Sequence, residues 1–261
     1  MRIFIEGIGL VGPGLENWPA ARAVLAGAAQ YEAAPVRLQP VTLLPPAERR
    51  RAGLTVKLAI VTGVEALAQA GRDAVDMPMV FAASGGDGDT LHETLAVLAT
   101  EQREVSPTKF HNSVHNAPSG YWAVATGSRV PSVSLSAFDG SFAAGLLEAA
   151  VQATVHDRAV TLIAYDAPYP EPLLAARPIE AIFGVALVLT PHRTDRARAA
   201  LTIAMAGAAS DATRMVDVAL ERLRLGNPAA RALPLLAAIA SADSMTIHLD
   251  GLELAVTPAD E

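Results

Sequence analysis

Two stretches of the chain hold the side chains whose types and spacing could support chemistry. The first, Ser106–Gly120, brings together serine, lysine, asparagine and two histidines. The second, Pro131–Gly145, begins as a strand and turns at Phe138-Asp139-Gly140 into a helix with small residues in its first turn. Such a turn projects one side chain at a helix N-terminus, where unpaired N–H groups and the helix dipole favour an anionic nucleophile or an oxyanion. We therefore expect the functional site at this turn.

Three other motifs match known patterns but lack the parts that their chemistry needs. Gly7-Ile8-Gly9-Leu10-Val11-Gly12 has the spacing of a dinucleotide-binding turn, but Pro13 would break the helix that must meet the pyrophosphate. Ser106 and Lys109 match S-x-x-K, without the companion elements of the hydrolases that use it. Ser84–Asp89 is rich in glycine but lacks the G-K-[ST] ending of a phosphate-binding loop. We expect no cofactor.

The histidines form no recognisable metal motif. His111 and His115 are four residues apart, but no Glu or Asp stands beside them as in H-E-x-x-H. His92 is followed by Glu93, yet Ala96 occupies the place of the second histidine. The G-x-S-x-G elbow of a serine hydrolase is also absent, so neither a bound metal nor a Ser–His–Asp site is expected.

The composition limits the chemistry further. The 261 residues include no cysteine, which excludes disulfides, cysteine-bound zinc, iron–sulfur clusters and every thiol nucleophile. The hydrophobic content of 51% excludes disorder, and the net charge of −7 provides no basic footprint for nucleic acid. The longest apolar runs, Ala181–Leu189 and Leu233–Ala240, are far shorter than the ~18 residues of a membrane span. Because Met1 begins no recognisable signal peptide, we expect a cytoplasmic protein.

The site must be positioned by an α/β fold, because segments with strand character alternate with helical ones. A glycine turn is expected at 7–12, and a weak linker at 168–178. Strands are predicted at 2–6, 77–83, 130–136, 159–165, 182–189 and 201–205, and a hairpin around Asp250-Gly251 at 245–255. Helices are predicted at 20–28, 55–70, 90–100, 118–127, 140–153 and 214–225. We expect the strands to form a mostly parallel sheet.

Five segments carry a family likeness as a set: Ile5–Val11, Val80–Gly88, Ser106–Gly120, Pro131–Ser141 and Phe183–Leu189. Together they resemble the opening strand, glycine loop, S-P…N…A-G segment, nucleophile elbow and closing strand of the β-ketoacyl synthases, members of the thiolase-fold superfamily. The resemblance implies a thiolase-like layered α/β fold. It consists of the N-terminal half, residues 1–190, and a short C-terminal α/β extension, residues 191–261, packed on the same core.

The chain departs from this family at the elbow. Aligning Pro131-Ser132-Val133 without gaps puts Asp139 where the family has its nucleophilic cysteine. A carboxylate there does not form a transferable acyl-enzyme as a thiolate does, and Asp139 could instead cap the helix or form a capping box with Ser136. The two catalytic histidines of the family lie in its second half, and neither His192 nor His248 matches them. We therefore expect no catalytic residue.

A ketosynthase-like subunit without a nucleophile resembles the chain length factor of type II polyketide systems, in particular the shortened subunit of aryl polyene pigment pathways. The resemblance implies a heterodimer with a catalytic β-ketoacyl synthase, in which the strand at 130–136 pairs with its counterpart. It also implies a role in fatty-acid-like biosynthesis, in which an acyl carrier protein delivers the polyene chain. Candidate tunnel residues, where bulk would stop a growing chain, are Phe110, His111, Val114, His115, Tyr121 and Phe138.

Two alternatives stay open. The chain could be an independent thioester-acting enzyme, a decarboxylase or hydrolase, with Asp139 as its base and backbone N–H groups as an oxyanion hole. It could also be a purely structural partner of the synthase. Independently of this choice, Phe110 and Phe138 could be core residues and not tunnel residues. Association with another chain is expected in any case, because half of a two-half fold leaves a sheet face or edge uncovered.

Overall fold

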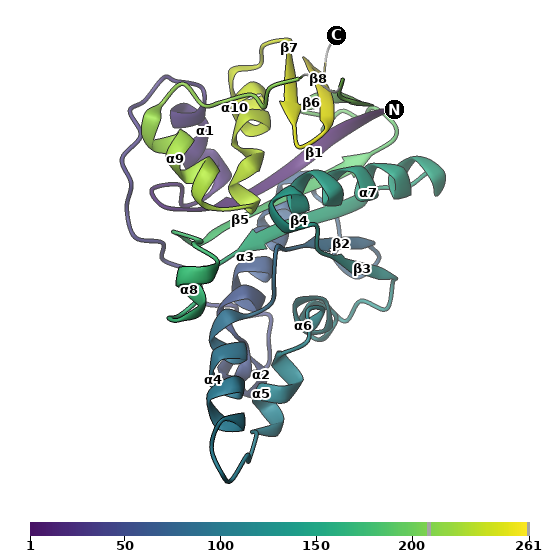
Figure 1. Ribbon diagram of the computed structural model, residues 1–261. Coiled ribbons are helices and arrows are strands. Elements are labelled where there is room, and N and C mark those ends of the chain that lie inside the picture. The colour runs from purple at the N-terminus through teal and green to yellow at the C-terminus, as the bar shows by residue number, and fades with distance from the viewer. Residues whose placement is uncertain (208–209, 260–261) are drawn as a thin grey trace.

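The computed structural model describes residues 1–207 and 210–259, which form one eight-stranded sheet with helices on both faces (Figure 1). The strand order is β3-β2-β4-β5-β1-β6-β8-β7. The strands are β1 (Arg2–Val11), β2 (Met79–Ala82), β3 (Ser132–Leu135), β4 (Val160–Asp166), β5 (Phe183–Thr190), β6 (Ala199–Met205), β7 (Met245–Leu249) and β8 (Leu252–Pro258). The α-helices are α1 (Trp18–Leu25), α2 (Pro46–Arg51), α3 (Leu54–Ala70), α4 (Gly88–Leu98), α5 (Pro107–Asn112), α6 (Ala117–Thr126), α7 (Ser141–Val155), α8 (Leu173–Ala176), α9 (Val218–Gly226) and α10 (Leu233–Ser241). Two 3₁₀ helices are η1 (Phe138–Gly140) and η2 (Ala229–Ala232).

The expectation of a mostly parallel sheet is wrong. Only β2 pairs in parallel, with β3 and with β4, and every other described pair is antiparallel. Strands β1 to β4 do run in one direction, because helices carry the chain back between them. The connections after β4 and β5 contain no helix long enough for such a crossover, and β5 enters between β1 and β4 in the opposite direction.

The predicted glycine turn at 7–12 is also wrong, because β1 continues through it to Val11. A Cβ built on Gly9 would lie 1.9 Å from the backbone oxygen of Thr62, and one on Gly7 would lie 2.1 Å from that of Ala66. Both oxygens belong to α3, which packs on β1. The glycines are therefore needed for close packing of a helix on a strand, and not for a turn.

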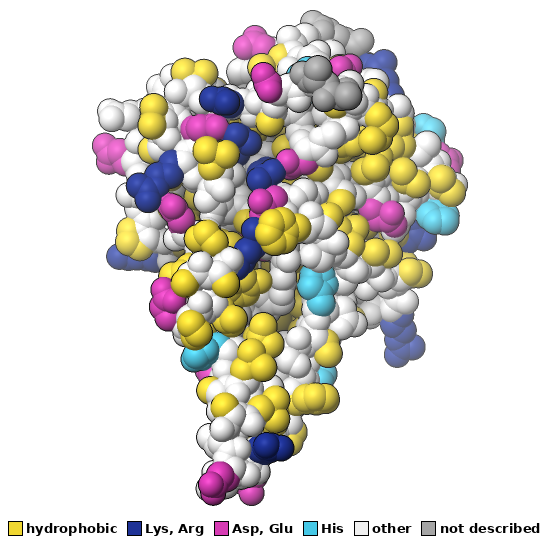
Figure 2. Space-filling view, in the orientation of Figure 1, with side chains coloured by type: hydrophobic (Ala, Val, Ile, Leu, Met, Phe, Trp, Pro, Cys, Tyr) yellow, Lys and Arg dark blue, Asp and Glu magenta, His cyan; other side chains and the backbone are white. Residues whose placement is uncertain are grey.

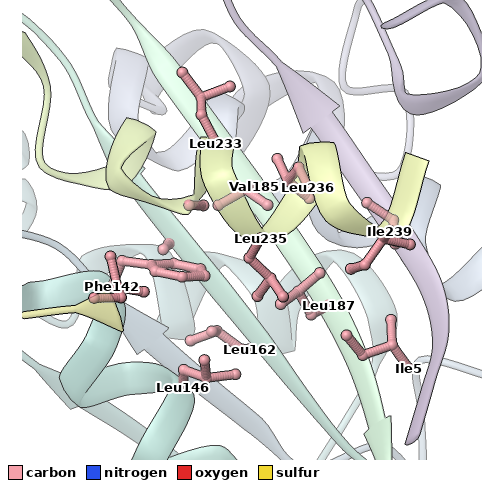
Figure 3. Packing of buried hydrophobic residues seen from close by; sticks show 14 of the residues in the cluster. Ile5, Phe142, Leu146, Leu162, Val185, Leu187, Leu233, Leu235, Leu236 and Ile239 are labelled. Carbon is pink, nitrogen blue, oxygen red and sulfur yellow. The ribbon is translucent and has the colours of Figure 1, made fainter. Parts of the chain in front are cut away.

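Two hydrophobic layers fill the space on either side of the sheet. On one face α7, η2 and α10 cover the central strands, where Leu235 packs near Leu187 of β5 and Phe142 lies over the sheet (Figure 3). On the other face α3 and α6 pack on the sheet, and Trp122 meets Phe81 edge to face at 6.3 Å. The two layers together fix the position of the strands that lead to the elbow.

Residues beyond 190 complete the same sheet. Strand β6 pairs with β1, β8 pairs with β6, and β7 forms the predicted hairpin with β8 around Asp250-Gly251. The apolar run at 233–240 is helix α10, and its side chains belong to the same hydrophobic layer as those of β1 and β5. Helix α9 begins at Val218, four residues later than predicted, because the side chain of Asp217 accepts from the N–H groups of Ala219 and Leu220.

The close contact between α3 and β1 leads to a stability prediction. Gly9→Ala should lower the free energy of unfolding by about 3 kcal/mol or more, because the new methyl group meets a helix backbone that cannot move aside. Gly120→Ala is the matched control, since this exposed position in α6 has nothing within 4 Å of an added Cβ and should be stabilised by about 0.5–1 kcal/mol. Urea unfolding of the three proteins measures both changes. Equal stability of Gly9→Ala and the wild type would contradict the packing argument.

Candidate functional site

The predicted elbow is present between β3 and α7. Residues 138–140 form η1, and Phe138 adopts a φ of 52°. This left-handed conformation is strained for a residue with a side chain, and strain of this kind gathers at functional sites. The side chain of Ser141 holds the turn, because its Oγ accepts from the N–H of Ala137 (3.0 Å) and donates to the carbonyl of Phe138 (2.7 Å).

Asp139 is paired with two arginines that come from distant parts of the chain. One carboxylate oxygen lies 2.6 Å from Nη2 of Arg177, and the other lies 3.2 Å from Nη2 of Arg231. Arg231 also pairs with Asp250, at the turn of the C-terminal hairpin. The elbow is therefore held by ion pairs to the segment after α8 and to η2.

The interpretation of Asp139 as a helix cap is wrong. The residue before α7 is Gly140, and no side chain caps this helix. Ser136 does not take part in a capping box, since its hydroxyl donates to the carbonyl of Ser84 (3.1 Å). The carboxylate instead lies between the two guanidinium groups, to which its charge attracts it.

Phe138 is the side chain that the elbow exposes most. Its ring is 63% exposed, and Cζ of Arg177 lies 3.8 Å from the ring centroid. One face of the ring is therefore covered by a cation, and the rest is open to a ligand or a partner chain. Phe138 is not part of either hydrophobic layer, so its interpretation as a core residue is wrong.

A buried carboxylate that we did not predict lies beside the elbow. Asp166, at the end of β4, is 4% exposed, and its Oδ1 accepts from the N–H (2.9 Å) and the hydroxyl (2.5 Å) of Ser84. Its Oδ2 is buried without a hydrogen-bond partner, and burial raises the pKa of this carboxyl to about 7. The detectable signal was an aspartate placed directly after an apolar strand. In parallel sheets, ligands bind outside the carboxyl ends of the strands, where Ser84, Ser136 and Asp166 meet.

The six tunnel candidates do not share one environment. Phe110 (67% exposed), His111 and Val114 (48% exposed) lie on the surface around α5. His115 is half-buried, with Nε2 3.4 Å from the carbonyl of Ala83 at the end of β2. Tyr121 is buried.

Tyr121 of α6 contacts helix α5 through two of its residues. The hydroxyl of Tyr121 donates to Oδ1 of Asn112 (3.0 Å), and its ring lies edge-on to His111 at 6.1 Å. Val114 and His115 line a narrow crevice with Tyr165 and the 85–87 loop, whereas Phe110, His111 and Phe138 lie outside it. The structure thus brings part of the predicted group to the end of β2 and leaves Phe110 on the outer surface.

Other kinds of site are not found in the part of the chain that the structure describes. No group of three or more His, Asp or Glu side chains there could hold a metal ion. No described helix is both long enough and apolar enough to cross a membrane.

The sheet, its helical layers and the elbow define a mixed α/β protein with the fold of the ketosynthase structures to which it is similar. Residues 16–247 match the family described as Beta-ketoacyl synthase, N-terminal domain, and the chain belongs to this family. The resemblance seen in the sequence is confirmed.

Solved structures include full-length matches. A chain of the ketosynthase (ApeO) in complex with its chain length factor (ApeC) from Xenorhabdus doucetiae is 22% identical, with a TM-score of 0.72 over 98% of this chain and 99% of that chain. A chain of the ishigamide ketosynthase/chain length factor is 14% identical, with a TM-score of 0.70 over 98% of each chain. A chain of the AntDE:AntF complex, a type II polyketide synthase carrier protein with its hexaketide-bound ketosynthase, is 14% identical, with a TM-score of 0.63 over 78% of this chain and 69% of that chain. At these identities the likeness establishes the fold. A search of curated protein sequences finds no match.

The buried carboxylate predicts a pH dependence of stability. Because the pKa of Asp166 is about 7 in the folded chain against 3.8 in an ordinary environment, the folded state disfavours the charge. Its contribution to stability is therefore greatest at low pH and is lost as the pH rises from about 4 to about 7. Asp166→Asn keeps an acceptor for Ser84 but has no charge, so its melting temperature should gain a few degrees on the wild type between pH 5 and pH 8.

Asp76→Asn is the control for this measurement, because Asp76 is exposed. Thermal melting of the three proteins at pH 5, 6, 7 and 8 gives the comparison. If the difference between Asp166→Asn and the wild type stays constant over this range, the carboxyl is not held in a disfavoured charged state.

Proposed function

We propose that this protein is a non-catalytic ketosynthase-like subunit, a chain length factor, that pairs with an active β-ketoacyl synthase and shapes the acyl tunnel in polyketide or aryl polyene biosynthesis. The observation that carries the proposal is the full-length match to chains of two ketosynthase/chain length factor complexes, in a chain without any cysteine. In this proposal residues 1–190 are the ketosynthase-like part, and residues 191–261 are an extension on the same core.

The surroundings of Asp139 support a non-catalytic role over an independent thioester-acting enzyme. Both oxygens of this carboxylate already face a guanidinium group, at 2.6 and 3.2 Å. A general base must have an oxygen free to accept a proton from the substrate within hydrogen-bond reach. A substrate proton would have to compete with both guanidinium groups for these oxygens, which disfavours Asp139 as the base.

Strand β3 is the edge at which we propose that the ketosynthase pairs. It is the last strand of the sheet on its side, and in the described residues no strand lies beyond it. The carbonyl of Leu135 points toward β2, because it accepts from the N–H of Ala83. Main-chain groups of successive residues in a strand point to opposite sides, so the N–H and carbonyl of Ser134 point to the open side of β3. An unpaired edge of this kind is a template for a strand of another chain.

Apolar side chains also lie exposed on the projection that α4 and α5 form (Figure 1). Leu91, Leu95 and Leu98 follow one another at helical spacing on α4, and all three are exposed. Helix α4 packs against α5, which carries the exposed Phe110. Several hydrophobic side chains lie on the projection that α4 and α5 form, among other side chains and above a charged tip (Figure 2), and another chain could cover them.

The chain that we propose to occupy the tunnel is a polyene attached to an acyl carrier protein. The surface around α5 and the elbow presents bulky side chains, among them Phe110 and Phe138, that could stop a growing acyl chain. The ketosynthase of one matching structure is described as bound to a hexaketide and in complex with its carrier protein. The purely structural alternative predicts no effect of these side chains on product length.

The proposed pairing leads to a prediction at Ser134. Ser134→Pro removes an N–H that points to the open side of β3, and proline is tolerated on edge strands. We expect binding to the partner ketosynthase to weaken more than tenfold, measured by calorimetry, while the chain itself stays folded. Ser134→Ala keeps the N–H and should bind within about twofold of the wild type. Equal affinity of Ser134→Pro and the wild type would exclude pairing through this edge.

A second prediction concerns product length. Phe110→Ala should lengthen the product of the reconstituted pair by at least one two-carbon unit, because the exposed Phe110 is proposed to face the tunnel that forms when the ketosynthase covers this surface. Mass spectrometry of the released chains measures the change, and Val155→Ala is the control, since Val155 is exposed at the far end of α7.

The buried Tyr121 calls for a milder change, Tyr121→Phe, because alanine there would disturb the core. Unchanged products from that variant and from alanine at Phe110, His111, Val114, His115 and Phe138 would rule out length control and favour the structural alternative.

A further inference from the structure

Arg177 makes two contacts with the elbow that no other described residue combines. Its guanidinium carbon lies 3.8 Å from the centroid of the Phe138 ring, and Nη2 lies 2.6 Å from Oδ1 of Asp139. Only 21% of the Arg177 side chain is exposed, so the group is held within the protein. The neighbouring carboxylate thus keeps the cation close to the ring by opposite charge.

The backbone of Phe138 is already fixed by other contacts. Its φ of 52° belongs to the elbow, and its carbonyl accepts from Ser141 at 2.7 Å. The remaining freedom of this residue is the rotation of its side chain, which is 63% exposed and outside both hydrophobic layers. The cation over this ring is Arg177, and its contact favours the observed orientation.

The orientation of the ring matters on the scale of an acyl chain. A change from one staggered χ1 rotamer to another moves the centre of a phenyl ring by about 5 Å. An extended two-carbon unit is about 2.5 Å long, since each C–C bond is about 1.5 Å. A ring that changes rotamer at the end of a tunnel would therefore admit or exclude one or two such units. Stacking of a cation on the ring favours one rotamer by roughly threefold to thirtyfold.

We propose that Arg177 is a positioning residue that holds the ring of Phe138 in one orientation and so narrows the range of chain lengths that the ketosynthase pair releases. The inference rests on the proposed function, since it gives a specificity role to a residue of the same elbow. Arg177 acts through Phe138 and touches no reacting atom.

Arg231 provides the matched control. It pairs with the same carboxylate at 3.2 Å, and its side chain is equally exposed at 21%, but no contact with the Phe138 ring is found. Arg177→Lys and Arg231→Lys each keep the positive charge beside Asp139. Only the first removes a planar group from the ring, because lysine cannot stack as a guanidinium does.

The first measurement uses the chain alone, with 4-fluorophenylalanine in place of Phe138. We expect a single narrow ¹⁹F signal for this ring in the wild type and in Arg231→Lys. In Arg177→Lys the signal should shift and broaden as the ring samples other rotamers. Identical signals in all three proteins would overturn the positioning role, whether or not a partner is present.

The second measurement uses the reconstituted pair and the distribution of product lengths. Arg177→Lys should spread the product over at least two neighbouring lengths, whereas Arg231→Lys should leave the distribution as it is. If Phe138→Ala changes the products and Arg177→Lys does not, the inference about Arg177 fails and the proposed function stands. If Phe138→Ala and the other tunnel variants all leave the products unchanged, the proposed control of chain length fails as well.

Discussion

The arrangement of the molecule depends on how closely helix α3 lies against the centre of the sheet. Gly7 and Gly9 have no side chain, and the backbone of α3 occupies the space where one would be. This contact sets the position of the N-terminal end of α3, where the hydroxyl of Thr55 donates to Asp87 at 3.1 Å. Asp87 in turn caps α4. The surface formed by α4 and α5 is therefore placed by backbone packing in the core, and a larger residue in β1 would displace it.

The two aspartates at the carboxyl ends of the strands show how surroundings decide what a carboxylate can do. Asp139 lies on the elbow with a guanidinium group beside each oxygen, so its negative charge is balanced by two cations. Asp166 is buried with one unpartnered oxygen, and burial raises its pKa to about 7. It binds Ser84, whose carbonyl accepts from Ser136. These hydrogen bonds join the ends of β4, β2 and β3, so the edge strand is linked to the interior of the sheet.

Features that depend on neighbouring residues could be predicted from the sequence, and those that depend on distant ones could not. The hairpin at Asp250-Gly251 was predictable because turn chemistry is local. The segment around Gly9 was predicted to be a turn, but its glycines are required by the close packing of α3, which is about fifty residues away in the sequence. The location of the elbow was predictable from its strand and small residues, but the pairing of Asp139 with Arg177 and Arg231 was not, since no local pattern links them. The raised pKa of Asp166 could not be predicted, because it results from burial in the fold, and the hydrogen-bond partner of this carboxylate, Ser84, lies 82 residues earlier.

The conformation of the elbow depends on residues outside it, because contacts with later parts of the chain hold the segment around the strained residue Phe138. A non-glycine residue stays at a φ of 52° only where the surrounding contacts over-determine it. Ser141 supplies the local contacts, whereas Arg177 and Arg231 anchor the adjacent carboxylate from the segment after α8 and from η2. Arg231 is held in turn by Asp250 of the C-terminal hairpin. Residues beyond 190 therefore help to shape the elbow. An interpretation of function from the segments before residue 190 alone would omit Arg231 and Asp250, which set the surroundings of the Asp139 carboxylate.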